Sequence, residues 1–195
     1  MKRQEKRKKG YYNLSRYNYK LGKIFVTDFV VLDFETTGLS PFLSNIIQIG
    51  AVRYRNFEAT NQLSLFVNPQ EFITAYITNL TGIRNEDVAE APTIDSALPE
   101  LLRFLGSDTI IAHNAPFDMK FLLVNMERLE IEAPIGEVID TLWLSQKYIY
   151  DVPDHKLPTL KSYLHLDDYA SHEALADCYV TGALYKYCYE RYMDF

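Results

Sequence analysis

The chain has 195 residues, 48% of them hydrophobic and 24% charged, which fits one globular domain with a sizeable core and leaves a second domain cramped. It has two cysteines without metal-ligand spacing, and neither a signal-like N-terminus nor an apolar stretch of the roughly 18 residues that cross a membrane, so we expect a cytoplasmic protein with reduced thiols and no membrane partner. The net charge of −6 is uneven, because residues 1–23 hold nine Lys or Arg and one Asp or Glu, against eleven and twenty-five in the remainder. Such an acidic body argues against wrapping by nucleic acid and predicts short contacts with it.

Residues 1–23 form a basic lead to the chain, with Lys-Arg-Lys-Lys at 6–9 and tyrosines at 11, 12, 17 and 19. Basic side chains between aromatic rings suit a single strand of nucleic acid, where charges follow phosphates and rings stack on bases. A solvated tail without a role explains the composition equally well. We therefore separate a basic, Tyr-rich N-terminal tail, residues 1–23, from a domain that covers residues 24–195.

The first predicted strand is the apolar run 29–32, which has the pattern of a strand buried on both faces. Asp33 and Glu35 follow it directly and, two positions apart, point to the same face, with Phe34 on the other. Two carboxylates about 4 Å apart in a partly shielded site repel each other by roughly 4 kcal/mol, so this pair calls for a cation. The alternative is an acidic pair on a solvated edge strand. It fits less well, because the residues just before the pair, 29–32, are all apolar.

Two further strands are predicted at 46–55 and 62–67, joined by a short link at 56–60, so the first three strands should be antiparallel. Helical spacing fills residues 72–106, with breaks at Gly82 and at Ala91-Pro92. A fourth strand at 108–112 can return parallel to the first, because helices precede it.

The remaining chain alternates helices with one brief strand. Pro116 suits the first position of a helix. After it the pattern predicts a strand at 138–139, a helix at 140–148, an irregular link at 151–158, a short helix at 159–164 and a last helix from about Ser171 to Tyr192. The predicted class is α/β, with a mixed five-stranded sheet of three antiparallel and two parallel strands flanked by helices.

Three later residues could join the acidic pair. Asp118 lies in the first turn of a helix that follows a strand parallel to the first, although the helix dipole alone favours an acid there. His172 and Asp177 lie five positions apart, about 140° around a helix, so His172 reaches a shared site only from the loop or first turn. A structural role for His172 is the alternative, and Glu173, four residues before Asp177, is its rival.

Three segments resemble the motifs of the DEDD 3′ to 5′ exonucleases, histidine variant. They are Asp-Phe-Glu-Thr-Thr-Gly at 33–38, His-Asn-Ala-Pro-Phe-Asp at 113–118 and His-Glu-Ala-Leu-Ala-Asp at 172–177. The match is closest to the proofreading exonuclease of bacterial replicative DNA polymerases, and Lys-Leu-Pro-Thr-Leu at 156–160 also resembles that family. The resemblance implies a ribonuclease H-like fold and two divalent cations, which all-carboxylate ligands restrict to hard ions such as Mg²⁺ or Mn²⁺.

The resemblance also implies a role for each residue. Asp33 would bridge both ions, Glu35 and Asp177 would hold the first, and Asp118 the second. His172 would accept the proton of the attacking water, as a histidine can near neutral pH. Substrate contacts would come from Thr36, Thr37, Leu39, His113 and Phe117. For Leu39 and Phe117, plain core packing is an equal alternative.

The resemblance further implies removal of nucleoside 5′-monophosphates from single-stranded or frayed 3′ ends of DNA. The same chemistry on RNA stays open, because nothing in the sequence reads the 2′-hydroxyl. A non-catalytic nucleic-acid-binding module is the alternative from another class. A DNA polymerase is a candidate partner, although the short stretch after the last helix leaves little room for a C-terminal tether to one.

Overall fold

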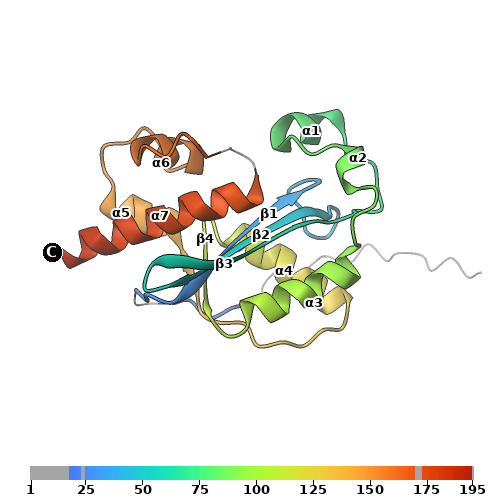
Figure 1. Ribbon diagram of the computed structural model, residues 1–195, viewed down its shortest axis with the longest axis horizontal. Coiled ribbons are helices and arrows are strands. Elements are labelled where there is room, and N and C mark those ends of the chain that lie inside the picture. The colour runs from blue at the N-terminus through green and yellow to red at the C-terminus, as the bar shows by residue number, and fades with distance from the viewer. Residues whose placement is uncertain (1–17, 23–24, 170–172, 195) are drawn as a thin grey trace, which may run out of the picture.

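The computed structural model describes residues 18–22, 25–169 and 173–194, which build one mixed sheet with helices on both faces (Figure 1). The sheet order is β3-β2-β1-β4-β5. β1 is antiparallel to β2, which is antiparallel to β3, while β4 and β5 continue the other side of the sheet in parallel with β1. The strands are β1 (Phe29–Thr36), β2 (Ile46–Arg55), β3 (Glu58–Phe66), β4 (Thr109–Ala112) and β5 (Val138–Asp140). The predicted mixed sheet is confirmed, and the central position of β1 removes the edge-strand alternative.

Each face of the sheet carries its own hydrophobic core. Val30, Leu32 and Phe34 of β1 pack on one face against α3 (Ile94–Leu105) and α4 (Pro116–Arg128). Phe29 and Val31 pack on the other face, where three helices cover the sheet. These are α5 (Thr141–Tyr148), α6 (Leu157–Tyr163) and α7 (Ala174–Met193). By the same alternation Asp33 and Glu35 face the α7 side, as the spacing predicts.

Two short helices form a separate group beside the end of β1 (Figure 1). They are α1 (Ala75–Thr81) and α2 (Asn85–Val88), and their apolar side chains pack on Ile47 in a small third cluster. The predicted break at Gly82 is confirmed, since Gly82 has a φ of 76° and its N–H caps α1 by donating to the Thr78 carbonyl at 2.8 Å.

The start predicted for the third strand is wrong by four residues. β3 begins at Glu58, because Asn56 and Phe57 both adopt positive φ and form a two-residue turn that lets Arg55 pair with Glu58. β3 is an edge strand, and most of its side chains are exposed. Four of its first five residues are polar (Glu58, Thr60, Asn61 and Gln62), so the sequence pattern there is typical of a loop.

Two helix starts also differ from the prediction. α6 begins at Leu157, two residues early, because Asp154 accepts hydrogen bonds from the Lys156 N–H and the Thr159 hydroxyl and so organises its first turn. The described part of the last helix begins at Ala174 rather than near Ser171, with Glu173 extended before it. Ser171 and His172 lie outside the described residues.

Most of the predicted tail, residues 1–17, also lies outside the described residues. Lys20 to Gly22 lie along β5, where the Val138 N–H donates to the Lys20 carbonyl and the Gly22 N–H donates to the Val138 carbonyl, both at 2.8 Å. The boundary after residue 23 stays a prediction. Cys178 and Cys188 are free and buried, and among the described residues no helix is both long and apolar enough to cross a membrane.

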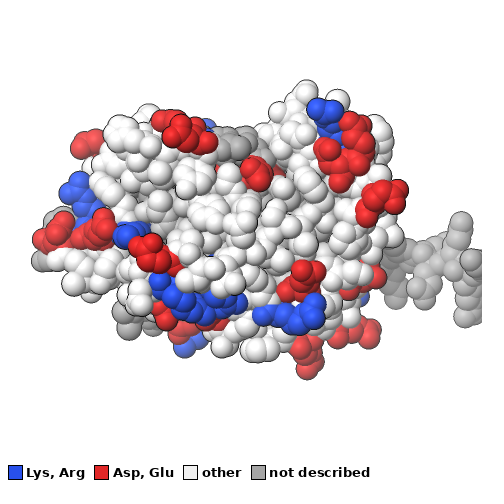
Figure 2. All heavy atoms as spheres, viewed as in Figure 1, with Lys and Arg blue, Asp and Glu red and all other residues white. Residues whose placement is uncertain are grey.

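Acidic and basic side chains are interspersed on the face of the molecule seen in Figure 2. Among the described residues on that face, basic side chains do not merge into one continuous patch. A nucleic acid that lies across this face would therefore need local attraction at a specific site.

Candidate active site

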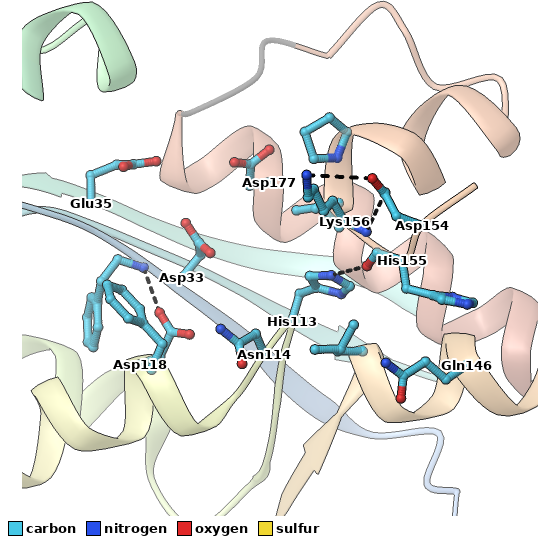
Figure 3. Close-up of a pocket in the computed structure, with 15 residues that line it drawn as sticks. Asp33, Glu35, His113, Asn114, Asp118, Gln146, Asp154, His155, Lys156 and Asp177 are labelled. Atoms are coloured by element: carbon cyan, nitrogen blue, oxygen red, sulfur yellow. Dashed lines mark hydrogen bonds and ion pairs between the residues drawn. The ribbon is translucent and has the colours of Figure 1, made fainter. Parts of the chain in front are cut away.

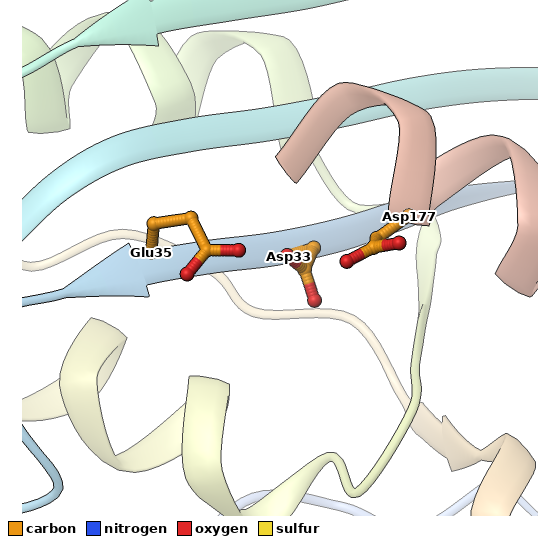
Figure 4. Close-up of side chains that lie close together, drawn as sticks. All are labelled: Asp33, Glu35 and Asp177. Carbon is orange, nitrogen blue, oxygen red and sulfur yellow. The ribbon is translucent and has the colours of Figure 1, made fainter. Parts of the chain in front are cut away.

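Three carboxylates meet on the α7 side of the sheet (Figure 4). Asp33 and Glu35 come from β1, and Asp177 comes from the first turn of α7. One carboxylate oxygen from each lies within 4.8 Å of the others. The fold thus brings together acids that are 144 positions apart in the sequence.

The fourth predicted acid, Asp118, lies in the first turn of α4 and is almost completely buried. Its Oδ1 accepts a hydrogen bond from the Phe34 N–H at 3.1 Å, which ties the start of α4 to β1 between Asp33 and Glu35. Asp118 lines the same cleft as the three clustered carboxylates but is outside their 4.8 Å group.

The position of Asp177 beside β1 depends on two residues of β2, on which the start of α7 packs. Gly50 is paired with Asp33 across the sheet, and a Cβ at Gly50 would collide with the backbone of Ala174 at the start of α7. Gln48, buried and paired with Glu35, accepts the Ala174 N–H at its Oε1 at 3.1 Å. Gly50 permits the close approach of α7, and Gln48 satisfies one of its free N–H groups.

The carboxylates open into a cleft of about 720 Å³ (Figure 3). Six of the predicted site residues line it: Asp33, Glu35, His113, Phe117, Asp118 and Asp177. The other lining residues are Phe34, Asn114, Leu142, Gln146, Asp154, His155, Lys156, Leu157 and Pro158.

Thr36, Thr37 and Leu39 are not among the lining residues. The Thr37 hydroxyl donates to Glu71 at 2.7 Å and accepts the Asn45 N–H, while the Thr36 hydroxyl donates to the Gly38 carbonyl at 2.8 Å. Both side chains therefore shape the loop after β1. Leu39 is 86% exposed on that loop, so core packing does not account for it.

His113 joins the end of β4 to the opposite wall of the cleft. Its Nε2 lies 2.9 Å from the His155 carbonyl oxygen, and its Nδ1 lies 3.0 Å from the Thr141 hydroxyl. A carbonyl only accepts, so Nε2 carries a proton. Burial lowers the pKa of His113, which favours the neutral ring. Phe117 is half-buried beside it and packs on Phe121 with ring centroids 5.0 Å apart.

The sequence analysis did not assign residues 154–158 to the site, because it predicted only an irregular link there. In the structure these residues form one wall of the cleft. The signal was present in Lys-Leu-Pro-Thr-Leu at 156–160, one of the segments that resemble the family. The site prediction also left out Asp140, which supports the site from outside the cleft. Its Oδ1 accepts both the Leu142 N–H and the Asn114 N–H and so holds the turn after β4 against the start of α5.

Burial and mutual repulsion perturb the acids. Burial raises the pKa of Asp33 well above its usual range, and the charges of Asp118, Asp177 and Glu35 raise it further. Burial raises the pKa of Glu35 from 4.5 to about 7, with a further contribution from Asp177. The pKa of Asp118 is also raised by burial, against the opposing hydrogen bond from Phe34.

These shifts predict how stability depends on pH when no divalent cation is bound. Between pH 4.5 and about 7 the folded state keeps the Glu35 proton that the unfolded state has lost, so stability falls as pH rises through this window. The full shift corresponds to about 3 kcal/mol in the free energy of unfolding.

Urea denaturation in EDTA at several pH values checks this expectation. Because other groups also titrate, the informative quantity is the difference between wild type and Glu35→Gln, which should gain stability relative to wild type as pH rises. A difference that is constant across the window would contradict the assignment of the shift to Glu35.

The residues present fit divalent metal ions. The three gathered donors are carboxylate oxygens, which hard cations such as Mg²⁺ and Mn²⁺ prefer. Of the described residues that line the cleft, Lys156 is the only Lys or Arg, and it stands against five acids. Bound cations would remove the repulsion that raises the pKa values of Asp33 and Glu35.

A five-stranded mixed sheet with acids gathered on its central strand is the ribonuclease H-like architecture of nucleases. Solved structures support this class. Exonuclease X in complex with 5′ overhanging duplex DNA is 25% identical, with a TM-score of 0.64 over 83% of this chain and 91% of that one. E. coli Exonuclease I in complex with a dT13 oligonucleotide shares the fold at 17% identity, with a TM-score of 0.75 over 87% of this chain and 42% of that one.

The chain belongs to the Exonuclease (RNase_T) family, whose family model matches residues 30–185, and it fits the DEDD proofreading exonucleases. The PolC-type DNA polymerase III of Caldanaerobacter subterraneus subsp. tengcongensis is 38% identical over 158 residues, or 81% of this chain. The same enzyme of Bacillus subtilis is 35% identical over 157 residues, or 80% of this chain. The matched segment spans 11% of the length of each of these two relatives.

Proposed function

We propose that this exonuclease domain hydrolyses the terminal phosphodiester at 3′ ends of DNA and releases nucleoside 5′-monophosphates, with two Mg²⁺ or Mn²⁺ ions as cofactors. The observation that carries the proposal is the meeting of Asp33, Glu35 and Asp177 within 4.8 Å in a cleft that also contains Asp118. An acidic site of this kind repels a phosphodiester until cations are bound, so we expect a strict metal requirement.

Each acid has a place in the proposed ion site. Asp33 would be shared by the two ions, Glu35 and Asp177 would hold one, and Asp118 would hold the other. Bound as a pair, the ions supply electrostatic stabilisation of the attacking and leaving oxygens at phosphorus. The hydrogen bond from Phe34 to Asp118 fixes one carboxylate oxygen and leaves the second for a ligand.

The remaining roles concern the proton and the substrate. His172 accepts the proton of the attacking water. Phe117, at the cleft, packs against the sugar or base of the terminal nucleotide, and the exposed Leu39 meets the same nucleotide from the loop after β1. The backbone at Thr36 and Thr37, held by the hydrogen bonds of that loop, adds contacts to it. The role of His113 is to keep the far wall of the cleft in place behind the substrate.

Single-stranded or frayed 3′ DNA ends are the proposed substrate, and a DNA polymerase is the proposed partner. The similarity to PolC-type DNA polymerase III supports DNA and a polymerase context, and that to Exonuclease X with overhanging duplex DNA supports a free strand end. The interspersed charge on the face seen in Figure 2 suits a short contact with a strand end.

Digestion of DNA and RNA strands labelled at the 3′ or the 5′ end tests the proposal. With Mg²⁺ or Mn²⁺, 3′-labelled DNA should release its label at once as a mononucleotide, while 5′-labelled DNA should shorten through a ladder. EDTA should stop both reactions. Release of the 5′ label first, or undiminished activity in EDTA, would overturn the proposal, and faster loss of RNA would reassign the substrate.

A further inference from the structure

Lys156 stands alone as a basic residue in an acidic cleft. The described lining residues include five acids, and no other Lys or Arg is among them. Ions held by Asp33, Glu35 and Asp177 would meet the charge of the scissile phosphate, but a strand that enters the cleft brings further phosphates. Those phosphates need a cation of their own near the rim.

Three hydrogen bonds hold the segment around Lys156, and Figure 3 draws the two that involve the Lys156 N–H and the His155 carbonyl. The Lys156 N–H donates to Asp154 Oδ1 at 3.1 Å, and the Thr159 hydroxyl donates to the same oxygen at 2.6 Å. One residue earlier, the His155 carbonyl accepts from the buried end of the His113 ring. These bonds place the base of the Lys156 side chain firmly on the cleft wall.

The ammonium group of Lys156, in contrast, is available to a ligand. Its side chain is 80% exposed, and its ion pair with Asp154 Oδ2 is long, at 3.6 Å. Exposed ion pairs of this kind contribute little to stability. Hydrogen bonds from the Thr159 hydroxyl and the Lys156 N–H are the two largest causes that lower the pKa of Asp154, and the Lys156 ammonium contributes less. A phosphate can therefore replace Asp154 as the partner of Lys156 with little loss.

We infer that Lys156 binds the backbone phosphate next to the scissile one, on the 5′ side of the penultimate nucleotide, and so positions the strand across the carboxylates. This inference rests on the proposed function. Lys156 lies at the rim of the cleft, with Asp154 as its partner. It would therefore contact the nucleic-acid backbone at the point where the strand leaves the clustered carboxylates. It acts as a binding residue for the strand and takes no part in bond breaking.

Binding of a short fluorescent oligothymidylate in Ca²⁺, followed by anisotropy, tests the inference without requiring hydrolysis. Lys156→Gln should weaken binding by about tenfold, the size of one charge-assisted hydrogen bond. The slope of log Kd against log salt should fall by about 0.7, the value for one phosphate contact on a single strand. Lys156→Arg should restore most of the affinity. Lys186→Gln, which removes a surface cation paired with Glu58, is the matched control and should bind as wild type.

A neutral methylphosphonate at the linkage next to the terminal one completes a double-mutant cycle. It should weaken binding to wild type as much as Lys156→Gln does, and it should cause no further loss in that variant. Equal losses from the phosphonate in both proteins, or unchanged affinity of Lys156→Gln, would overturn the inference. Hydrolysis of the unmodified strand in Mg²⁺ by wild type is scored separately, so failure of the exonuclease proposal is distinguishable from failure of this one.

Discussion

Asp33→Asn is expected to lower the rate of DNA hydrolysis in Mg²⁺ by at least about a thousandfold. Asp33 lies between Glu35 and Asp177 in the cluster and is the one acid proposed to bridge both ions. Metal ions in such sites contribute several kcal/mol to transition-state stabilisation, and each 1.4 kcal/mol or so corresponds to a factor of ten in rate. An amide of the same shape keeps the packing but loses the charge that attracts the ions.

The same substitution should stabilise the protein when ions are absent. Burial and three neighbouring carboxylates all raise the pKa of Asp33. Its charged form therefore destabilises the folded state, through lost hydration and charge repulsion. We expect Asp33→Asn to gain about 1–3 kcal/mol in the free energy of unfolding in EDTA near pH 8, and to lose the stabilisation that Mg²⁺ gives wild type.

Single-turnover digestion and urea denaturation with and without Mg²⁺ measure the two effects on one preparation. Glu100→Gln, which exchanges an exposed acid on α3 for an amide, is the control and should resemble wild type in both. An Asp33→Asn protein that is both inactive and less stable in EDTA would indicate damage to the fold and contradict the role of Asp33 as a repelled, ion-bridging acid.

His172→Ala is expected to lower the rate constant by about 10² to 10⁴, the usual contribution of a general base. Metal binding should be retained, because the four acids are untouched. The acidic limb of the pH–rate profile, which reports the deprotonation of the base, should disappear, and added imidazole should restore part of the rate.

Glu173→Ala separates the two candidates at the start of α7. Glu173 is exposed and extended before the helix, and its carbonyl accepts the Asp177 N–H at 2.9 Å, a contact that its side chain does not make. Its replacement should therefore leave the rate near that of wild type. A crippled Glu173→Ala protein beside an active His172→Ala protein would reverse the assignment of the base.

The sequence is informative where chemistry and local pattern coincide. The bounds of β2 agree with the prediction, and the side of the sheet that Asp33 and Glu35 face follows from a spacing of two along a strand. The sheet order follows from the connections, since short links join the first three strands and helices precede the fourth.

What the sequence did not reveal depends on contacts between distant segments. Gly50 and Gln48 bring α7 to the acids, yet in the sequence they are ordinary members of a strand. The sequence of residues 154–158 predicts only an irregular link. Its position in the cleft wall depends on the hydrogen bond from His113 to the His155 carbonyl, 42 residues along the chain, which no local pattern reveals. An exposed strand is also hard to predict, because it lacks buried apolar residues. The first residues of β3 are exposed and mostly polar, so the sequence predicted its start four residues too late.

The contact between Gly50 and the start of α7 has a consequence for the order in which activity appears. The third carboxylate of the cluster is carried by the last helix, so a growing polypeptide on the ribosome has Asp33 and Glu35 long before it has Asp177. Until α7 is made and seated on β2, the nascent domain has an incomplete ion site. Synthesis itself thus delays completion of the carboxylate cluster until α7 has been made, after all five strands of the sheet.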